Sequence, residues 1–214
     1  RLADTFNAMI ARLKDSFQRV NQFSIDVSHE LKTPLTILKG ETELALRKDR
    51  TNEEYKKSLE SNLAEIDRMS HIIDDLLLLS KAETKDMRLN LDKVDLRDLL
   101  ADVCLNMKIF GENKGVEIIA KELEDIRIVG DALKLRRMIT NIVENGIKYG
   151  HAGGYVAVSA CKQDGFACIN VKDDGPGISS DDIKYIFDRF YRADKSRKRE
   201  SGSGLGLSIS KWIA

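Results

Sequence analysis

The sequence predicts two parts: an all-α helical hairpin that forms a dimeric four-helix bundle, followed by an α+β domain of the α/β-sandwich type. Two observations predict this fold. Residues 2–76 carry apolar side chains at helical spacing, with one polar break between two runs. From about residue 91, short β-prone runs alternate with amphipathic helical stretches, which is typical of a mixed α+β domain.

The first helix is expected to run from residue 2 to about Leu46. Its apolar residues follow the alternating four-three spacing of a coiled-coil seam, with Ser16 as one polar interruption. A seam of this kind predicts a helix that pairs with another copy. The seam residues are Leu2, Phe6, Met9, Leu13, Val20, Phe23 and Val27, continued by Leu31, Leu35 and Leu38.

A second helix follows the polar stretch 47–52, which is typical of a connecting turn. Thr51 or Asn52 can cap this helix, and Glu53 and Glu54 suit its first turn. A hairpin cannot bury a long apolar stripe alone, so we expect a homodimer. The stripe of the second helix consists of Leu59, Leu63, Ile66, Met69, Ile73 and Leu76.

The α+β part contains four predicted strands and a long amphipathic helix. Asp131 can cap this helix, which is expected to run to about Tyr149. Gln163, Asp164 and Gly165 predict a tight turn that joins the last two strands as an antiparallel hairpin. Residues 195–204 are polar enough to predict a mobile loop. The expected strands cover residues 116–120, 126–129, 155–160 and 167–172.

Composition excludes several classes of function. The 35 basic and 35 acidic residues cancel, so no nucleic-acid partner is expected. Three cysteines without a C-x-x-C pair fit neither a disulfide framework nor a zinc site, which favours a reducing compartment. No apolar run approaches the roughly 20 residues that span a bilayer, so we expect this chain to be soluble as given.

His29 is placed on the solvent side of the first helix. At about 100° per residue it lies roughly opposite Val27 and Leu31, which are expected to face the bundle core. Thr33 lies one turn further on, on the same face as His29. Pro34 has no backbone N–H to donate, so we expect the helix to kink or loosen there.

A histidine in this position is a candidate nucleophile. Neutral imidazole can attack an electrophile near neutral pH, and the adjacent Glu30 can orient the ring and accept its proton. A lone exposed histidine would carry no such meaning, and we interpret His71 and His151 in that plain way. The interpretation of His29 therefore depends on the residues around it, 28–35.

A second group of polar residues suits a phosphate ligand, although both common glycine-rich phosphate motifs are absent from the sequence. Asn141, Asn145 and Lys148 are predicted to line one face of the helix after Asp131. Buried amides need partners, which Mg²⁺ and phosphate oxygens supply, whereas the plain alternative is a polar outer stripe. Three further segments favour the ligand: residues 173–178 directly after a strand, 187–192 and 202–207.

The segment around His29 resembles the phosphoacceptor box of bacterial two-component sensor histidine kinases. The later segments resemble the N, G1, F and G2 boxes of the histidine-kinase ATP-binding domain, in the same order and with similar spacing. The resemblance implies an enzyme that uses Mg²⁺ and ATP to phosphorylate His29 and passes the phosphoryl group to an aspartate of a response regulator receiver domain. It also implies a homodimer.

The resemblance assigns roles to individual residues. It implies that His29 is the phosphoacceptor, that Glu30 is the general base, and that Thr33 positions water when the partner is dephosphorylated. Asn145 is similar to the Mg²⁺ ligand of the family, and Asn141 stands beside it.

The nucleotide contacts are implied in the same way. Lys148 is expected near the phosphates, Tyr149 against the adenine, and Asp173 as the acceptor from the adenine amino group. Gly175 and Gly177 are expected to open the lid over the nucleotide. The further implied contacts are Ile178, Phe190, Arg192, Gly202, Gly204, Leu205 and Gly206.

The same ATP fold serves type II topoisomerases, heat-shock chaperones and mismatch-repair ATPases. Those ATPases carry a water-activating glutamate one turn before the metal-binding asparagine, where this chain has Asn141. Glu144 lies on a different face of the helix. The missing base favours transfer to His29 over hydrolysis. Two alternatives stay open: a non-catalytic nucleotide-binding scaffold and an ATP-hydrolysing member of the superfamily.

Three short segments resemble parts of membrane sensor kinases and so imply a cellular setting. Residues 2–9 resemble the end of a HAMP linker, which implies membrane segments before residue 1 and a place on the cytoplasmic side of a bacterial inner membrane. Residues 40–43 and 60–63 resemble sensor kinases for heavy metals such as copper or silver. The expected domains are a HAMP end and coiled-coil linker (1–20), a dimerisation and histidine-phosphotransfer hairpin (21–90), and an ATP-binding domain truncated at its C-terminus (91–214).

Overall fold

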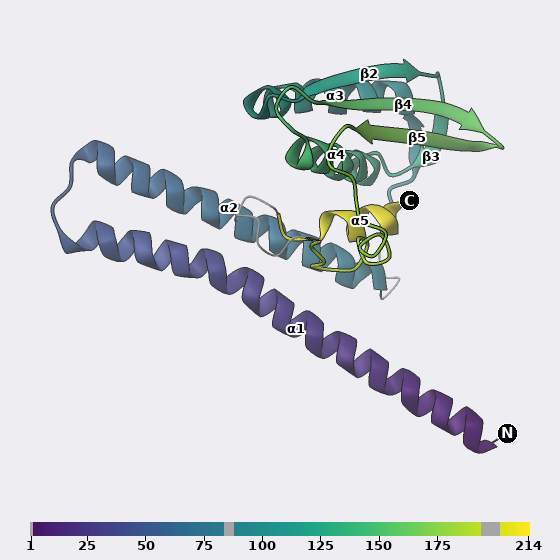
Figure 1. Cartoon of the computed structure of the whole chain (residues 1–214), viewed down its shortest axis with the longest axis horizontal. Helices are drawn as coiled ribbons and strands as arrows, with labels where there is room; N and C mark the ends of the chain where they lie inside the picture. The colour runs from purple at the N-terminus through teal and green to yellow at the C-terminus, as the bar shows by residue number, and fades with distance from the viewer. Residues whose placement is uncertain (1, 84–87, 194–201) are drawn as a thin grey trace. The chain divides into compact units, whose positions relative to one another are not determined.

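The chain divides into two compact units, Arg1–Leu76 and Leu77–Ala214 (Figure 1). The computed structural model describes residues 2–83, 88–193 and 202–214. Residues 195–201 of the predicted mobile loop therefore lie outside the described residues. Within the described ranges, no helix combines the length and the apolar character that crossing a membrane requires.

The first unit contains a helical hairpin, and the last residues of its second helix, 77–83, belong to the second unit. Helix α1 (Leu2–Arg47) and helix α2 (Asn52–Glu83) run antiparallel, and the Asn62 amide of α2 donates to the Thr42 hydroxyl of α1 at 3.2 Å (Figure 1). Helix α1 continues through Pro34 without interruption. The predicted hairpin is thus confirmed.

The start of α2 is fixed by a reciprocal capping box. The Thr51 backbone N–H donates to Glu54 Oε2 at 2.8 Å, and the Glu54 N–H donates to Thr51 Oγ1 at 3.2 Å. The Thr51 hydroxyl also donates to Glu54 Oε2, at 3.1 Å, and the backbone and hydroxyl hydrogen bonds that Thr51 donates hold the pKa of the Glu54 carboxyl below its ordinary value. Of the two predicted caps, Thr51 is the one used.

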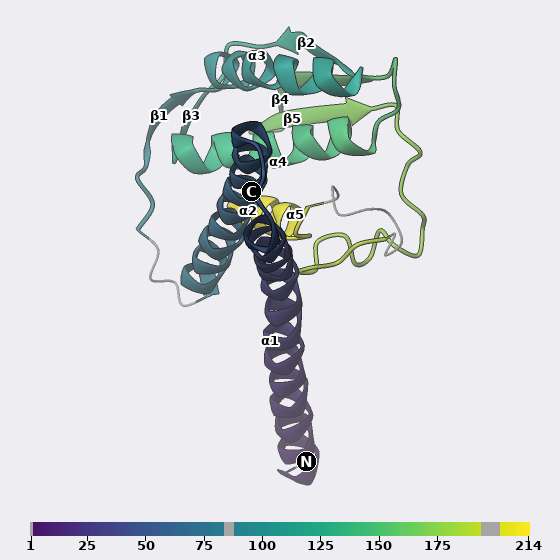
Figure 2. The same ribbon diagram turned by 90° about the vertical axis from the view of Figure 1, so that its left-hand side faces the viewer.

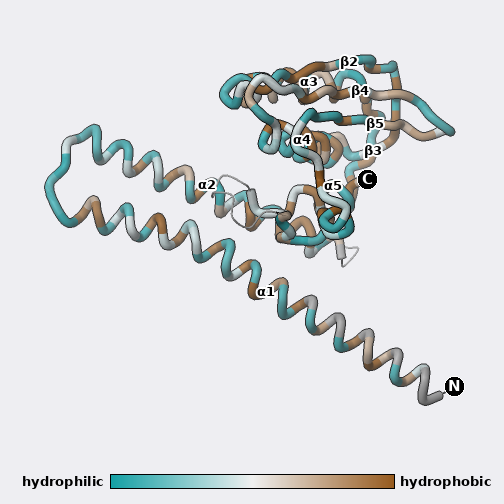
Figure 3. Tube along the Cα trace, viewed as in Figure 1, coloured by the Kyte–Doolittle hydropathy of each residue, from teal (hydrophilic) through white to brown (hydrophobic). Residues whose placement is uncertain are grey.

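A long apolar stripe is exposed along the hairpin. Apolar residues recur along both helices, whereas the turn between them is hydrophilic (Figure 3). A single chain therefore leaves a large apolar surface in contact with water. The exposed large side chains of this unit include Phe6, Met9, Leu13, Phe17, Val20, Leu35, Leu59, Leu63, Ile66 and Ile73.

The second unit is a two-layer α/β sandwich, which confirms the predicted fold class (Figure 2). Strand β2 pairs in parallel with β4, which pairs antiparallel with β5, while β1 pairs antiparallel with β3. The elements are β1 (Asp92–Asp95), α3 (Leu96–Lys114), β2 (Glu117–Leu123), β3 (Arg127–Gly130), α4 (Ala132–Tyr149), β4 (Tyr155–Gln163), β5 (Phe166–Asp173) and α5 (Gly206–Ile213).

The core of this unit lies between one face of the sheet and the helices α3 and α4. Alternate residues of β4 point into it, since Val156, Val158 and Ala160 are buried. Helix α3 contributes Leu100 and Val103, which are also buried. From α4 come Met138, Ile139, Val143 and Ile147.

Two sequence signals set the geometry around this core. Asp131 caps α4 as predicted, accepting from the backbone N–H groups of Leu133 and Lys134 at 3.2 Å each. The turn between β4 and β5 has Asp164 at φ +50° and Gly165 at φ +83°, as a two-residue hairpin loop requires. The antiparallel hairpin predicted there is confirmed.

Candidate functional site

Helix α4 carries the predicted amides and ammonium on a partly buried face. Asn141, Asn145 and Lys148 are all partly buried. Gly146 lets this helix lie close to the sheet, because a Cβ there would come within 2.8 Å of Val156 Cγ2 and 3.5 Å of Asp173 Cβ. The polar face therefore lies next to the end of β5.

The segment after β5 folds back against the C-terminal end of α4. Asp173 Oδ1 accepts from the Gly175 N–H at 2.9 Å, and a Cβ at Gly175 would lie 3.2 Å from the Tyr149 carbonyl oxygen. The neighbouring Asp174 accepts from the Tyr155 N–H at 3.0 Å. Glycine is thus needed at position 175 for the close approach.

The segment from Gly202 to Gly206 contacts α4 at two points. Gly202 has φ +66°, and a Cβ on it would lie 2.6 Å from Lys148 Nζ. Four residues further on, the Asn141 amide donates to the Gly206 carbonyl at 3.2 Å. The Lys148 ammonium lies 5.8 Å from the centre of the Tyr149 ring. The structure therefore brings Lys148, Tyr149 and Gly202 together.

The segment around Phe190 joins the same assembly. The Phe190 N–H donates to the Gly204 carbonyl at 3.0 Å. Both residues have positive φ, +60° and +73°, and a Cβ on Gly204 would lie 2.8 Å from the Phe190 carbonyl carbon. The three predicted nucleotide segments outside α4 are therefore linked to it, directly or through one another.

A hydrogen-bonded group that the sequence did not suggest fixes the segment between Gly177 and Phe190. Tyr191 Oη donates to Asp182 Oδ1 at 2.5 Å, and Ser179 Oγ donates to Asp182 Oδ2 at 2.7 Å. The hydrogen bond to Asp182 raises the pKa of Tyr191 to about 12 and lowers that of Asp182. The S-x-x-D spacing of Ser179 and Asp182 was the available signal.

Three predicted contact residues lie in different surroundings. The Leu205 side chain is fully buried, so only its backbone is available to a ligand. Ile178 is 52% exposed, and a Cβ on the preceding Gly177 would meet open space. Arg192 is partly buried. Leu205 is therefore a core residue, whereas Ile178 belongs to the surface.

The predicted phosphoacceptor residues lie on α1, in the other unit. The His29 side chain is exposed, as predicted, and Glu30 beside it is partly buried. Thr33 is exposed, and its hydroxyl donates to the His29 carbonyl at 3.2 Å. An accessible imidazole next to a carboxylate can accept an electrophile and release a proton.

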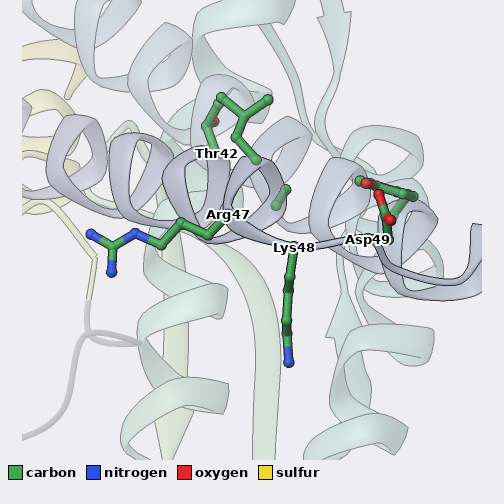
Figure 4. Close-up of a pocket in the computed structure, with 7 residues that line it drawn as sticks. Thr42, Arg47, Lys48 and Asp49 are labelled. Atoms are coloured by element: carbon green, nitrogen blue, oxygen red, sulfur yellow. The ribbon is translucent and has the colours of Figure 1, made fainter.

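A shallow pocket occurs at the turn of the hairpin (Figure 4). It contains none of the predicted site residues, so the chemistry described above does not depend on it. Its lining consists of Thr42, Ala45, Leu46, Arg47, Lys48, Asp49 and Tyr55.

Two protein families match the chain. The His Kinase A (phospho-acceptor) domain matches residues 19–85. The Histidine kinase-, DNA gyrase B-, and HSP90-like ATPase family matches residues 130–214. The first match contains His29, and the second contains α4 and the three segments linked to it.

Curated relatives align along the whole chain. The sensor histidine kinase CusS of Escherichia coli is 35% identical over 214 residues, covering 100% of this chain and 44% of CusS. The sensor protein CzcS of Cupriavidus metallidurans is 34% identical over 209 residues, covering 97% of this chain and 44% of CzcS. The chain thus spans less than half the length of these relatives.

Solved structures share the fold. Histidine kinase AdeS of Acinetobacter baumannii aligns with TM-score 0.69 and 24% identity over 86% of this chain and 85% of AdeS. Full-length ShkA in complex with AMPPNP aligns with TM-score 0.64 and 27% identity, over 90% of this chain and 40% of ShkA. Histidine kinase ThkA in complex with the response regulator protein TrrA aligns with TM-score 0.71 and 20% identity, over 94% of this chain and 56% of the ThkA chain.

These matches agree with the order of elements in the structure, a helical hairpin followed by an α/β nucleotide domain. The chain belongs to the sensor histidine kinase family and carries its phosphoacceptor domain followed by its ATPase domain.

Proposed function

We propose that this chain is the kinase portion of a membrane sensor, which transfers the γ-phosphoryl group of ATP to His29 and then to an aspartate of a response regulator receiver domain. The observation that carries the proposal is the assembly of three separate segments along α4, combined with an exposed histidine inside a phosphoacceptor domain. In the first step an imidazole nitrogen bonds to phosphorus, the bond to ADP breaks, and Glu30 or water takes the proton.

The residues along α4 fit a nucleotide. Because residue 202 is glycine, its backbone can lie next to the Lys148 ammonium. Backbone N–H groups and an ammonium at one place suit anionic phosphate oxygens. One carboxylate oxygen of Asp173 accepts from the Gly175 N–H. We propose that the carboxylate also accepts from the adenine amino group and that Tyr149 packs against the adenine ring. The remaining contacts are proposed for Gly177, Ile178, Phe190, Arg192, Gly204 and Gly206 and for the backbone of Leu205.

Mg²⁺ fits the amides of α4, because hard cations take oxygen ligands. Asn145 would hold the ion, with Asn141 beside it. When bound, Mg²⁺ neutralises phosphate charge and orients the transferred group. The AMPPNP complex of ShkA, a relative of similar fold, supports an adenine nucleotide as the ligand.

We propose three further properties of the whole protein. The phosphoacceptor domain and the exposed stripe of the hairpin support a homodimer with a four-helix bundle. The response regulator bound to ThkA supports a receiver domain as partner, and Thr33 is proposed to position water when that partner is dephosphorylated. Similarity to CusS and CzcS supports a heavy-metal sensor at the bacterial inner membrane, with sensing segments outside this chain.

The decisive experiment uses ATP labelled at the γ-phosphate, with Mg²⁺. We expect acid-labile, alkali-stable label on the wild-type chain, and loss of at least 99% of it in His29→Ala and Asn145→Ala. His71→Ala is the matched control, because His71 is also an exposed helical histidine, and it should keep full labelling.

Two results would contradict the proposal. Nucleotide binding without any label on wild type would favour a non-catalytic scaffold. Phosphate release that persists in His29→Ala would favour an ATP-hydrolysing enzyme. For the phosphatase step, Thr33→Ala should slow dephosphorylation of the regulator while labelling of His29 continues.

A further inference from the structure

Two cysteines meet across the β4–β5 hairpin. Cys161 of β4 is the direct register partner of Cys168 of β5, both are free thiols, and both are partly exposed. They are seven positions apart in sequence and form no C-x-x-C pair, so only the sheet register brings them together. The third cysteine, Cys104, is buried in the core.

Both thiols lie on the face of the sheet that points away from the helices. Their strand neighbours Ala160 and Ile169 face the core, and side chains alternate along a strand. Cys168 Sγ lies 3.9 Å from Gln163 Oε1, which belongs to the same outer face. A small solute can therefore reach the pair.

The register also fixes the separation of the two side chains. Gln163 and Phe166 close the two-residue turn and form a hydrogen-bonded pair, and such pairs alternate with non-hydrogen-bonded ones. Cys161 and Cys168, two positions further, are again a hydrogen-bonded pair, the wider kind, with Cβ atoms about 5 Å apart. A disulfide prefers a Cβ separation of about 3.8 Å.

A metal bridge fits this separation better than a disulfide. Metal–thiolate bonds of about 2.3 Å place two sulfurs about 4.6 Å apart when they lie on opposite sides of one ion. Thiolates select soft cations such as Cu(I). Among the described residues no group of three or more His, Cys, Asp or Glu side chains could hold a metal, so a tetrahedral zinc site is not formed here.

We propose that Cys161 and Cys168 form a two-coordinate site for one soft metal cation of the Cu(I) type. Binding forms two metal–sulfur bonds and releases the two thiol protons, with no change in oxidation state. The affinity therefore rises with pH. The bound ion joins β4 to β5 on the face opposite the nucleotide-domain helices, and the site does not depend on the proposed kinase reaction.

The test is anaerobic titration of the reduced chain with Cu(I) against a chromophoric Cu(I) chelator. We expect one tightly bound ion per chain, with at least a hundredfold weaker binding in Cys161→Ser and in Cys168→Ser. Cys104→Ser is the control and should bind like wild type, because burial keeps that thiol away from solvent and raises its pKa. Binding should strengthen from pH 6 to pH 8.

Several results would overturn the site. Wild-type affinity in either single variant would show that the two thiols do not act together. A stoichiometry of one ion per two chains would indicate a bridge between molecules. Loss of both thiols and 2 Da of mass on exposure to oxidised glutathione, without Cu(I) binding in the reduced chain, would make the pair a disulfide. Circular dichroism of each variant separates these results from unfolding.

Discussion

At the scale of single residues, Gly204 has no room for a side chain. Its φ is +73°, and an added Cβ would lie 2.8 Å and 2.9 Å from the Phe190 carbonyl carbon and Cα. These are backbone atoms, so they cannot rotate away as a flexible side chain would. The contact between the two loops therefore depends on glycine at this position.

Gly204→Ala is expected to weaken ATP binding by at least tenfold, about 1.4 kcal/mol. The methyl group would separate the Phe190 segment from the Gly202–Gly206 segment. Isothermal titration with ATP measures the effect. Gly153→Ala is the matched control, because Gly153 also has positive φ, +84°, but a Cβ there meets open space. Equal affinities in the two variants would contradict the expectation.

At the scale of elements, α4 is held at its start by Asp131. The carboxylate accepts from the N–H groups of Leu133 and Lys134 and also from the Asn90 N–H at 3.1 Å. Burial alone would raise the pKa of Asp131, but these hydrogen bonds outweigh it and lower the pKa. One side chain thus both caps the helix and fixes the segment before β1.

Removing this cap should destabilise the nucleotide domain. Asp131→Ala is expected to lower its free energy of unfolding by about 1–2 kcal/mol at pH 7, and Asp131→Asn by less, because asparagine also caps helices. Urea unfolding followed by Trp212 fluorescence reports on this domain, since Trp212 lies on α5. A variant as stable as wild type would contradict the role of the cap.

The stability that Asp131→Ala loses should depend on pH, and the lowered pKa of Asp131 fixes the direction of this dependence. The pKa of Asp131 is lower in the folded chain than in the unfolded one. Its contribution to the free energy of unfolding is therefore complete above the ordinary aspartate pKa of about 3.9, and it is lost as the pH falls through the pKa of the folded state. The stability difference between wild type and Asp131→Ala should therefore shrink on acidification below pH 4. A difference that grows there would reverse the sign.

Local signals explain which elements could be predicted. The hairpin, the Asp131 cap and the Gln163–Gly165 turn depend on neighbouring residues, so the sequence predicts them. The Cys161–Cys168 pair follows from the same turn, because a two-residue loop sets the register of the strands beside it. The Tyr191–Asp182 hydrogen bond depends on how the irregular segment after β5 folds, and no local signal reveals it. The buried side chain of Leu205 was missed for the same reason.

At the scale of the whole molecule, the exposed stripe of the hairpin predicts self-association. Leu63 is 58% exposed in a single chain although it belongs to the apolar stripe of α2. Burying a leucine side chain contributes about 1.5–3 kcal/mol of favourable free energy. In a twofold dimer each leucine of the stripe is buried in both copies, so its contribution counts twice. The stripe is therefore large enough to drive association.

Sedimentation should show a dimer of the 24.1 kDa chain. Leu63→Glu should raise the dimer dissociation constant at least hundredfold, because each copy would bury a charge. Leu133→Glu is the control, since Leu133 is 78% exposed in the nucleotide unit and should not affect the dimer. A monomeric wild type, or equal effects of the two substitutions, would contradict the dimer.

The hydrogen bond from Asn141 to the Gly206 carbonyl has a consequence for the evolution of new activities on this fold. The resemblance discussed above leads us to expect a glutamate at the position of Asn141 in ATPases that hydrolyse ATP, but a carboxylate cannot donate to a carbonyl. Asn141→Glu alone would remove the donor to the Gly206 carbonyl and bring a negatively charged acceptor into its surroundings, between α4 and the start of α5. A path from phosphotransfer to hydrolysis therefore crosses a less stable intermediate unless the loop at Gly206 changes together with residue 141, so the two substitutions are epistatic.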